Sequence, residues 1–306
     1  MNLFERIVKY AAMAFAVLLS FGIIAGILTG VLSAAGMMSE DISFFRAEQM
    51  KQEDITKEFS DVKNLKVDIS FGKVEIIEGH TFRVTATNIP ADCVIALQNE
   101  TLVVEKEDSV FVLPFFNWKQ NEKAHILIEV PSGFVAHTAE LESGAGAFFV
   151  EKLSAENLIL DTGSGSFVGK HLSAMKTNMD TGSGNVTIED ATLGELTLES
   201  GSGLVRMREV TAHNVEFESG SGSISIEGSL TGDCSFDTGS GRVDLLLYGD
   251  RKDYRILTEL GSGSFWLDGN RIKEDTIDIS AKHTLDFDTG SGSVSIEFKQ
   301  HHKENH

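Results

Sequence analysis

The sequence predicts an all-β protein, a parallel β-solenoid of about 19-residue coils preceded by one transmembrane helix. Three observations support this prediction. The tripeptide Gly-Ser-Gly recurs every 19 residues between positions 163 and 241. Apolar residues alternate with polar ones around each tripeptide, and residues 10–38 contain no charged side chain. A fixed period indicates stacked repeats, alternation indicates strands with one buried face, and a long uncharged run indicates a membrane span.

The composition excludes several classes of protein. The 306 residues include 26 basic and 46 acidic side chains, which gives a net charge of −20. Nucleic-acid binders need a basic face for phosphate contacts, so we expect no nucleic-acid partner. The only two cysteines, Cys93 and Cys234, lie far apart in the sequence. The chain is therefore neither a disulfide-rich scaffold nor a protein with a cysteine-ligated structural zinc, and we expect no cofactor.

We interpret residues 1–38 as a cytoplasmic tip and an uncleaved signal anchor. At about 1.5 Å per residue, the uncharged run exceeds the roughly 30 Å hydrocarbon core of a bilayer. Arg6 and Lys9 precede the run, whereas acidic residues follow it. This bias predicts a cytoplasmic N-terminus and an extracytoplasmic remainder. The alternative is a cleaved signal peptide with a small-residue cleavage site at 33–35, although the apolar region of a signal peptide usually has only about 7–15 residues.

Three glycines in this run, Gly22, Gly26 and Gly30, are spaced four residues apart. On a helix they leave three bare patches on one face, where a second helix can approach closely. The spacing would allow a homodimer through the membrane helix. We favour the simpler explanation that glycine is common in membrane helices.

Residues 39–64 are polar, and we interpret them as a juxtamembrane stalk. Apolar residues recur in this segment with a loose helical spacing that includes Ile42, Phe45, Ile55 and Phe59. This spacing favours a helix.

Residues 65–140 have the pattern of a β region that caps the stack. Apolar residues alternate on both sides of Gly72 like a degenerate coil, and residues 102–104 and 126–128 form further apolar runs. A cap would stop the open edge of the solenoid from recruiting other chains.

The repeats occupy residues 141–298. Each unit has the pattern strand, Gly-Ser-Gly corner, strand and return, with a further apolar residue such as Leu153, Leu172 or Val210 on the third side. Stacked units place equivalent strands about 4.8 Å apart, with their apolar residues inside. A coil of this length encloses little beyond a dry apolar core, so we expect no internal ligand cavity. We expect residues 299–306 to be a disordered tail.

The corner glycines have a predicted structural role, because a sharp corner needs backbone angles or clearances that other residues resist. Longer steps before Gly261 and Gly290 indicate loops at 248–251 and 268–271. The regularly spaced corner glycines are Gly163, Gly165, Gly182, Gly184, Gly201, Gly203, Gly220, Gly222, Gly239 and Gly241.

Three parts of the sequence resemble a known family. They are Leu-Lys-Val-Asp-Ile-Ser at 65–70, Ile-Glu-Val-Pro-Ser-Gly at 128–133, and the Asp-Thr-Gly-Ser-Gly coils. They are similar to the bacterial putative-adhesin family, a domain of unknown function that includes LiaG-like cell-envelope proteins. The resemblance covers about residues 60–298. It implies a right-handed β-solenoid, often membrane-tethered and connected with adhesion or envelope stress, and it supplies no catalytic residues.

An acidic residue stands two positions before every tripeptide, and these residues would form a ladder of like charges. Each adjacent pair would repel by roughly 1 kcal/mol. Backbone N–H groups, salt screening or bound divalent cations would offset this repulsion. We favour a solvated ladder over a calcium site, because the Gly-Gly-x-Gly-x-Asp order of calcium solenoids is absent. The regularly spaced ladder residues are Asp161, Asp180, Glu199, Glu218 and Asp237.

Four coils contain Asp-Thr-Gly-Ser, the sequence of the active-site turn in aspartic proteases. That chemistry needs two carboxylates that share one proton across two lobes. Here the motif repeats in neighbouring coils, and glutamate replaces aspartate in others, so a repeat corner explains it better.

Two groups of aromatic residues are candidate contacts. Phe115, Phe116 and Trp118 cluster beside a proline, either as core of the cap or as an exposed apolar patch. Trp266 is out of phase with its apolar neighbours Phe265 and Leu267, so we expect it to face solvent.

The sequence therefore favours a non-enzymatic, membrane-anchored extracytoplasmic solenoid, an adhesin or a cell-envelope interaction or stress-response module. One alternative is a divalent-cation-responsive surface protein. A second is a carbohydrate-active β-helix enzyme, which would need a local, non-repeating cluster of carboxylates. The evenly spaced acids do not form such a cluster.

Overall fold

The described part of the chain is built almost entirely from strands. The computed structural model describes residues 52–90, 92–106, 124–272, 276–277 and 281–299. Within these residues, one hydrogen-bonded sheet contains 22 strands, and one turn of 3-10 helix, η2, spans Arg251–Asp253.

The strands fall into three groups along the chain. The first group is β1 (Gln52–Phe59), β2 (Asn64–Ile69), β3 (Lys73–Gly79), β4 (Phe82–Pro90), β5 (Cys93–Gln98), β6 (Thr101–Lys106) and β7 (His125–Pro131). The repeat strands are β8 (Val135–Ser143), β9 (Ala147–Glu151), β10 (Ser154–Thr162), β11 (Ser166–Thr181), β12 (Asn185–Ser200), β13 (Leu204–Ser219), β14 (Ser223–Thr231), β15 (Asp233–Thr238) and β16 (Arg242–Tyr248). The last are β17 (Tyr254–Leu260), β18 (Ser264–Leu267), β19 (Asn270–Ile272), β20 (Thr276–Ile277), β21 (His283–Thr289) and β22 (Ser293–Lys299).

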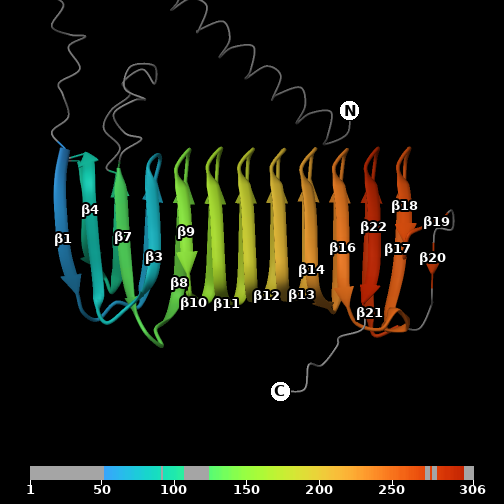
Figure 1. Cartoon of the computed structure of the whole chain (residues 1–306), viewed down its shortest axis with the longest axis horizontal. Helices are drawn as coiled ribbons and strands as arrows, with labels where there is room; N and C mark the ends of the chain where they lie inside the picture. The colour runs from blue at the N-terminus through green and yellow to red at the C-terminus, as the bar shows by residue number, and fades with distance from the viewer. Residues whose placement is uncertain (1–51, 91, 107–123, 273–275, 278–280, 300–306) are drawn as a thin grey trace, which may run out of the picture. The chain divides into compact units, whose positions relative to one another are not determined.

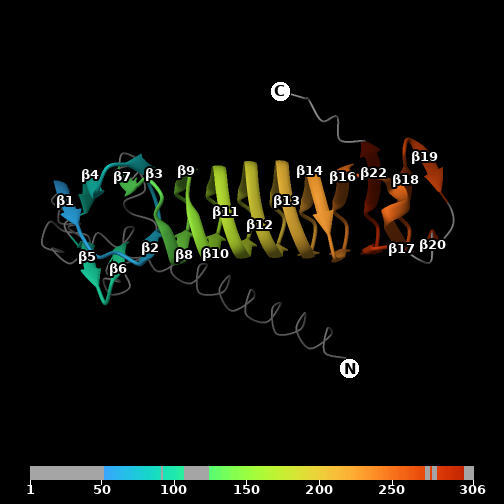
Figure 2. The same cartoon turned by 90° about the horizontal axis from the view of Figure 1, so that it is seen from below.

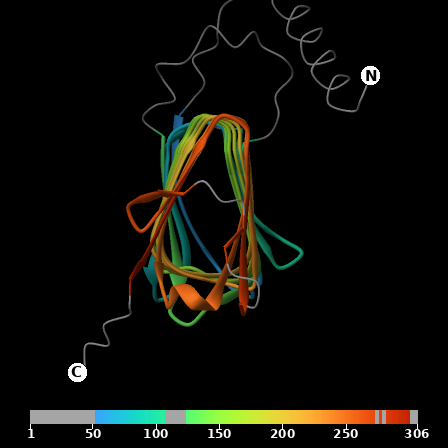
Figure 3. The same ribbon diagram turned by 90° about the vertical axis from the view of Figure 1, so that its right-hand side faces the viewer.

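The strands of the repeats form two parallel rows that meet at the Gly-Ser-Gly corners (Figure 1). One row contains the strand that enters each corner, and the other contains the strand that leaves it. Seen along the stack, the rows converge at a narrow end and are joined by the return segments at the opposite end, where η2 also lies (Figure 3). The long strands β11, β12 and β13 each bend around the return, so one strand serves two successive coils. The predicted parallel stack of 19-residue coils is confirmed.

At both ends of the stack, two coils pack in an order that differs from their order in the chain. At the C-terminal end, β15 and β16 pair with β21 and β22, which in turn pair with β17 and β18. The Phe236 and Phe287 rings stack at a centroid distance of 5.0 Å across this junction. At the N-terminal end, β2 and β3 lie between β6 and β7 on one side and β8 and β9 on the other. The expectation that each coil packs on its neighbours in sequence is wrong for these coils.

At each end, two coils have thus exchanged places relative to their order in the chain. This exchange puts the coils that contain long insertions at the ends of the stack. The segment 107–123 interrupts the coil of β6 and β7, and residues 268–282 follow β18. An insertion in an end coil can project without separating two stacked neighbours. Antiparallel strands β4 and β5 at one end, and β19 and β20 at the other, then pair with the outermost coils (Figure 2). They cover part of the sheet edges that a solenoid would otherwise leave open.

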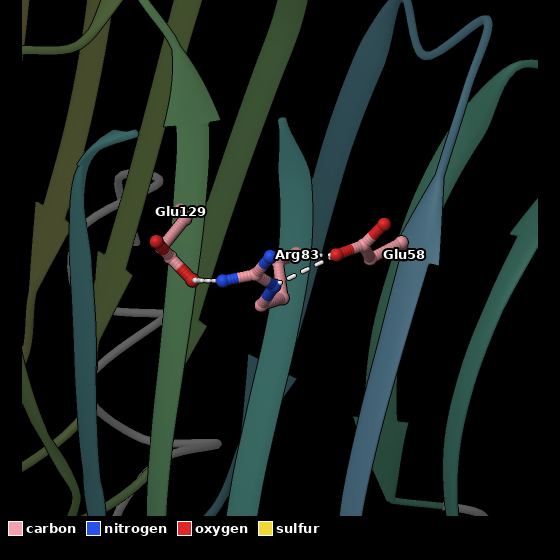
Figure 4. A network of polar contacts seen from close by, with 3 residues as sticks. All are labelled: Glu58, Arg83 and Glu129. Carbon is pink, nitrogen blue, oxygen red and sulfur yellow. Dashed lines mark hydrogen bonds and ion pairs between the residues drawn. The ribbon is translucent and has the colours of Figure 1, made fainter. Parts of the chain in front are cut away.

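Residues 52–59 form strand β1, not the helix that the apolar spacing favoured. This strand pairs antiparallel with β4, from Gln52 opposite Pro90 to Phe59 opposite Phe82. Arg83 on β4 ties the three strands at this end together: its guanidinium lies 2.6 Å from Glu58 of β1 and 3.4 Å from Glu129 of β7 (Figure 4). The pairing with β4 outweighs a helical spacing that included only two apolar residues in this segment.

The interior is filled by ladders of apolar side chains. Equivalent inward positions carry Phe148 and Phe167, then valine or isoleucine, and the row before the corner carries Leu160, Met179 and Leu198, all at most 3% exposed. The residues expected on the third side, Leu153, Leu172 and Val210, are also buried. Each fully buried side chain of this size contributes about 1.5–3 kcal/mol, so the repeated ladders dominate the stability.

The corner glycines are needed for clearance and not for an unusual backbone angle. The glycines with left-handed φ lie elsewhere, for example Gly72 and Gly194. A Cβ on Gly182 would lie 2.8 Å from the carbonyl oxygen of Gly163 in the next coil, and one on Gly203 would overlap the carbonyl oxygen of Gly184 even more closely. The sequence left open whether the corners need unusual backbone angles or clearance, and the structure shows that they need clearance: most adjacent corners approach too closely for a side chain, with Gly220 among the exceptions.

No helix in the described residues is long and apolar enough to cross a membrane. The predicted span at 10–38, with Gly22, Gly26 and Gly30, lies outside these residues, as do residues 300–306 of the predicted tail.

The close approach of neighbouring corners predicts that two corner glycines, Gly203 and Gly220, differ in how much stability is lost when each is replaced by alanine. Gly203→Ala should destabilise the protein by about 1–3 kcal/mol, because the new methyl overlaps the backbone of Gly184. Gly220→Ala should be near neutral, because its methyl would lie 3.2 Å from a single carbonyl oxygen, that of Gly201. Urea unfolding of the two variants followed by circular dichroism measures the difference. Equal losses in both would contradict the clearance argument.

Candidate interaction surfaces

The acidic residues before the corners form one continuous ladder on the outer face of the entering strands. Each lies opposite the next in the strand register, from one end of the stack to the other. Two residues that sequence reasoning missed, Glu105 and Asp68, extend it at the N-terminal end. At the C-terminal end Asp288 precedes Glu259, because the coils are exchanged. In spatial order the ladder is Glu105, Asp68, Glu142, Asp161, Asp180, Glu199, Glu218, Asp237, Asp288 and Glu259.

The outer face of the leaving strands balances its charges instead. Glu151, Lys170, Glu189, Arg208 and Glu227 lie in register with alternating sign. The Lys170 ammonium lies 2.9 Å from the Glu189 carboxylate, and Arg208 lies 3.8 Å from the carboxylates on both of its neighbours. The same repeat therefore carries a compensated ladder on one face and an uncompensated acidic ladder on the other.

Burial and the neighbouring charges raise the pKa of several ladder carboxyls. Desolvation, followed by the charge of Asp180, raises the pKa of Asp161. Desolvation and then Asp288 raise the pKa of Asp237. The pKa of Glu142 rises to about 7, first because it shares a hydrogen bond with Glu140 and then through desolvation. These groups hold protons more tightly in the folded chain than in the unfolded one.

In the coils from Glu142 to Asp288, the residue between the ladder acid and its corner is a Ser or Thr whose hydroxyl points inward, whereas Leu260 follows Glu259. Thr162 Oγ1 donates to Thr181 Oγ1 at 3.1 Å, and the Gly241 and Gly292 N–H groups donate to Thr238 and Thr289 in their own corners at 2.9 and 2.8 Å. The sequence analysis aligned these positions but did not assign them a role. These Ser and Thr residues recur two positions after an inward apolar residue, which places them on the buried face of the strand. The sequence thus contained a signal for their role, because a buried hydroxyl needs a hydrogen-bond partner nearby.

A shallow depression of about 340 Å³ lies along the middle of the acidic ladder. Asp180, Glu199, Glu218 and Asp237 line it. No group of three His, Cys, Asp or Glu side chains among the described residues is arranged to hold a metal ion. The structure thus brings the predicted acids together as a row, with each acid on its own strand.

The aromatic candidates have different outcomes. Trp266 faces solvent with 42% of its surface exposed, whereas Phe265 and Leu267 on either side are buried, as their alternation predicted. Phe115, Phe116 and Trp118 lie outside the described residues.

Together, the parallel coils, the Gly-Ser-Gly corners and the long regular outer faces define an all-β, solenoid-like repeat protein. The chain belongs to the Toastrack DUF4097 family, whose model matches residues 51–297. This confirms the resemblance that the coils indicated.

Two solved structures resemble the chain in fold. One is a putative lipid binding protein from Parabacteroides distasonis ATCC 8503, with a TM-score of 0.52 and 15% identity over 82% of this chain and 98% of that one. The other is a putative adhesin from the same organism, with a TM-score of 0.52 and 12% identity over the same shares of the two chains. At such identities the likeness concerns the fold alone. No curated protein matches the chain significantly.

The acidic ladder predicts that removing one charge stabilises the protein. Glu218 lies in register between Glu199 and Asp237, so Glu218→Gln should raise the unfolding free energy by up to about 1–2 kcal/mol at low ionic strength. The gain should largely disappear near 1 M salt, where the screening length is only about 3 Å. Thermal unfolding of the full chain at both salt concentrations tests this.

Glu216→Gln is the matched control for this experiment. Glu216 lies two residues earlier on the same strand and is also exposed, but its register partners are the uncharged Thr197 and Ser235. It should show little gain at either salt concentration. A salt-sensitive gain of equal size in both variants would mean that overall net charge, and not the ladder, is responsible.

The raised pKa of Glu142 predicts a pH dependence of stability. Asp68 and Lys66 on β2 and Glu140 on its own strand are the charged groups that act on it. Because the pKa of Glu142 is higher in the folded chain than in the unfolded chain, protonated Glu142 stabilises the fold. This contribution is fully present at a pH below the pKa of an ordinary glutamate, and it is lost as the pH rises to about 7. Glu142→Gln keeps a hydrogen-bond donor toward Glu140, so its stability should fall less between pH 5 and 7.5. Parallel curves for variant and parent would contradict the assignment.

Proposed function

We propose that the protein is a non-enzymatic, membrane-anchored interaction module of the cell envelope, related in function to adhesins. A single-pass anchor at residues 10–38 would hold a right-handed solenoid outside the membrane, as parallel β crossovers are almost always right-handed. The spacing of Gly22, Gly26 and Gly30 would allow the anchor helices to pair. The name adhesin that one structural relative carries agrees with this proposal.

One observation carries the proposal: equivalent side chains lie in register along both outer faces through successive coils. Such faces are regular, and the entering-strand face offers a carboxylate in every coil. Repeated weak contacts along a rigid face give avidity without a deep pocket, which suits attachment to a large or repetitive partner.

A divalent-cation-responsive surface protein ranks second. The in-register carboxylates favour this alternative, because bound cations would relieve the repulsion between neighbours. It ranks lower because the ladder offers each cation only one carboxylate per coil, whereas calcium takes six to eight oxygen ligands.

A labelling experiment tests where the chain lies. In a chain with Cys93→Ser and Cys234→Ser, Ser202→Cys places a thiol at an exposed corner, and Asn2→Cys places one in the expected cytoplasmic tip. In intact cells that produce the full chain, a membrane-impermeant maleimide should label the first variant and should label the second only after permeabilisation. The reverse pattern would refute the proposed topology, and a shortened protein in the medium would show that the anchor is cleaved.

A binding experiment tests the interaction role. Fluorescent liposomes that carry the full chain should bind isolated cell envelopes saturably, and protein-free liposomes of the same lipid should not. Equal retention of the two liposome preparations would contradict an adhesin-like role.

A further inference from the structure

A polar depression at the C-terminal end of the stack differs from the rest of the repeat surface. Its volume is about 490 Å³, and it lies over the corners and leaving strands of the last coils. The residues that line it are mostly serines and glycines, together with one cation, Arg242, and one carboxylate, Asp244. Six serines line it and offer hydrogen-bond donors and acceptors at coil spacing: Ser223, Ser240, Ser262, Ser264, Ser291 and Ser293.

The outward positions that line this depression vary from coil to coil. The position of Asp244 is occupied by Val168, Thr187, Arg206 and Ser225 in earlier coils, and that of Arg242 by Asn185, Leu204 and Ser223. Asp244 and Arg242 lie two residues apart on β16, so the lining has one acid and one base on the same strand face. Burial raises the pKa of Asp244, and Arg242 opposes this shift.

Trp266 lies on the outermost coil, two residues beyond Ser264, which lines the depression. In strand register Asp244 lies opposite Ser295, and Ser295 lies opposite Trp266, so the indole lies two strand spacings from the carboxylate on the same face. Strand β18 is hydrogen-bonded to β22 on one side and to β19 on the other. The backbone beneath the exposed indole is therefore held on both edges, and the ring is presented from a rigid element.

We propose that Trp266, Asp244 and Arg242 form a binding site for a neutral carbohydrate chain whose sugars present a flat C–H face to the exposed indole, as β-linked glucose-configured pyranoses with equatorial substituents do. The exposed indole would stack on the apolar C–H face of one sugar. Asp244 would accept hydrogen bonds from hydroxyls of the next sugars, and Arg242 and the serines would donate to their oxygens. The site gives the envelope interaction proposed above a partner class, and it rests on that proposal.

The surface chemistry favours a glycan over a lipid bilayer or a protein partner. A net charge of −20 opposes approach to an anionic membrane. Protein interfaces centre on clustered apolar anchors, whereas Leu204 is the only aliphatic residue among the described residues that line the depression. Sugar hydroxyls both donate and accept, and they match a lining of serines with one acid and one base.

The site is arranged for binding and not for cleavage. Most glycoside hydrolases use two carboxylates that flank the scissile bond. Among the described residues that line the depression, Asp244 is the single carboxylate. We therefore expect the sugar to be released unchanged.

Tryptophan fluorescence provides a direct test, because the chain contains only two tryptophans. In the full chain with Trp118→Phe, emission reports Trp266 alone. Titration with cellotetraose and with tetra-N-acetylchitotetraose should change the emission saturably. The oligosaccharide that binds with higher affinity shows whether the site prefers unmodified or N-acetylated glucose units. Trp266→Ala should abolish binding measured by calorimetry, and Asp244→Asn should weaken it about tenfold through the loss of charged hydrogen bonds.

The control is Phe149→Ala, which removes another exposed aromatic ring far along the stack and should leave the affinity unchanged. Circular dichroism of each variant confirms folding. No response to either oligosaccharide, equal affinity in Trp266→Ala, or a response to phospholipid vesicles alone would each overturn the inference. If envelope binding by the liposomes persists while the oligosaccharides fail to bind, the carbohydrate site is wrong and the interaction role stands.

Discussion

Neighbouring coils contact each other backbone to backbone at every Gly-Ser-Gly corner, and the rest of the structure depends on this contact. The N–H of Ser183 donates to the carbonyl of Gly163 at 2.8 Å, and that of Ser202 donates to Gly182 at the same distance. Most of these contacts need glycine because a Cβ would enter the neighbouring backbone, and Gly220 has more room than the others. Once the corners are fixed at this spacing, both rows of strands must follow in register, and the inward side chains must stack in ladders.

Because equivalent positions lie in register, a side chain that recurs in every repeat forms a row along the outer face of the stack. An acid at one outward position becomes a row of ten carboxylates, and the repulsion between neighbours accumulates along the row. At the Glu189 position the repeat alternates acid with base and forms ion pairs across the coils. Because the same chain makes a balanced face, the acidic face is not an unavoidable product of the fold. It is a cost in stability for which a surface role is the natural explanation.

The sequence was sufficient to predict what the period determines and insufficient for what lies outside it. Alternation around each corner predicted the parallel rows, the buried third-side residues such as Leu172, and the solvent-facing Trp266. The exchange of coils at both ends was not predictable, since Phe287 and Ile256 suit either stacking order equally well as inward apolar residues. Strand β1 was missed because its place depends on a distant partner, β4, and two apolar residues at 55 and 59 satisfy a helical spacing by chance. For the site, the ladder from Glu142 onward was predictable from spacing alone. The depression was not, because its lining comes from β16, β18 and β22, and the exchange of coils sets the order of these strands.

Specific recognition is most easily built at the end of such a stack. In the middle, a change at one position faces two equivalent neighbours, so a bulky or charged residue must fit both of them. On the outermost coil one side carries no further coil, and the paired strand β19 can support a large side chain on β18 without separating stacked coils. Trp266 occupies this kind of position, and the exchange of coils places it two strands from Asp244 instead of one. That separation leaves room along the face for a chain of sugars between an aromatic platform and a charged acceptor, whereas direct neighbours would contact each other and close the gap.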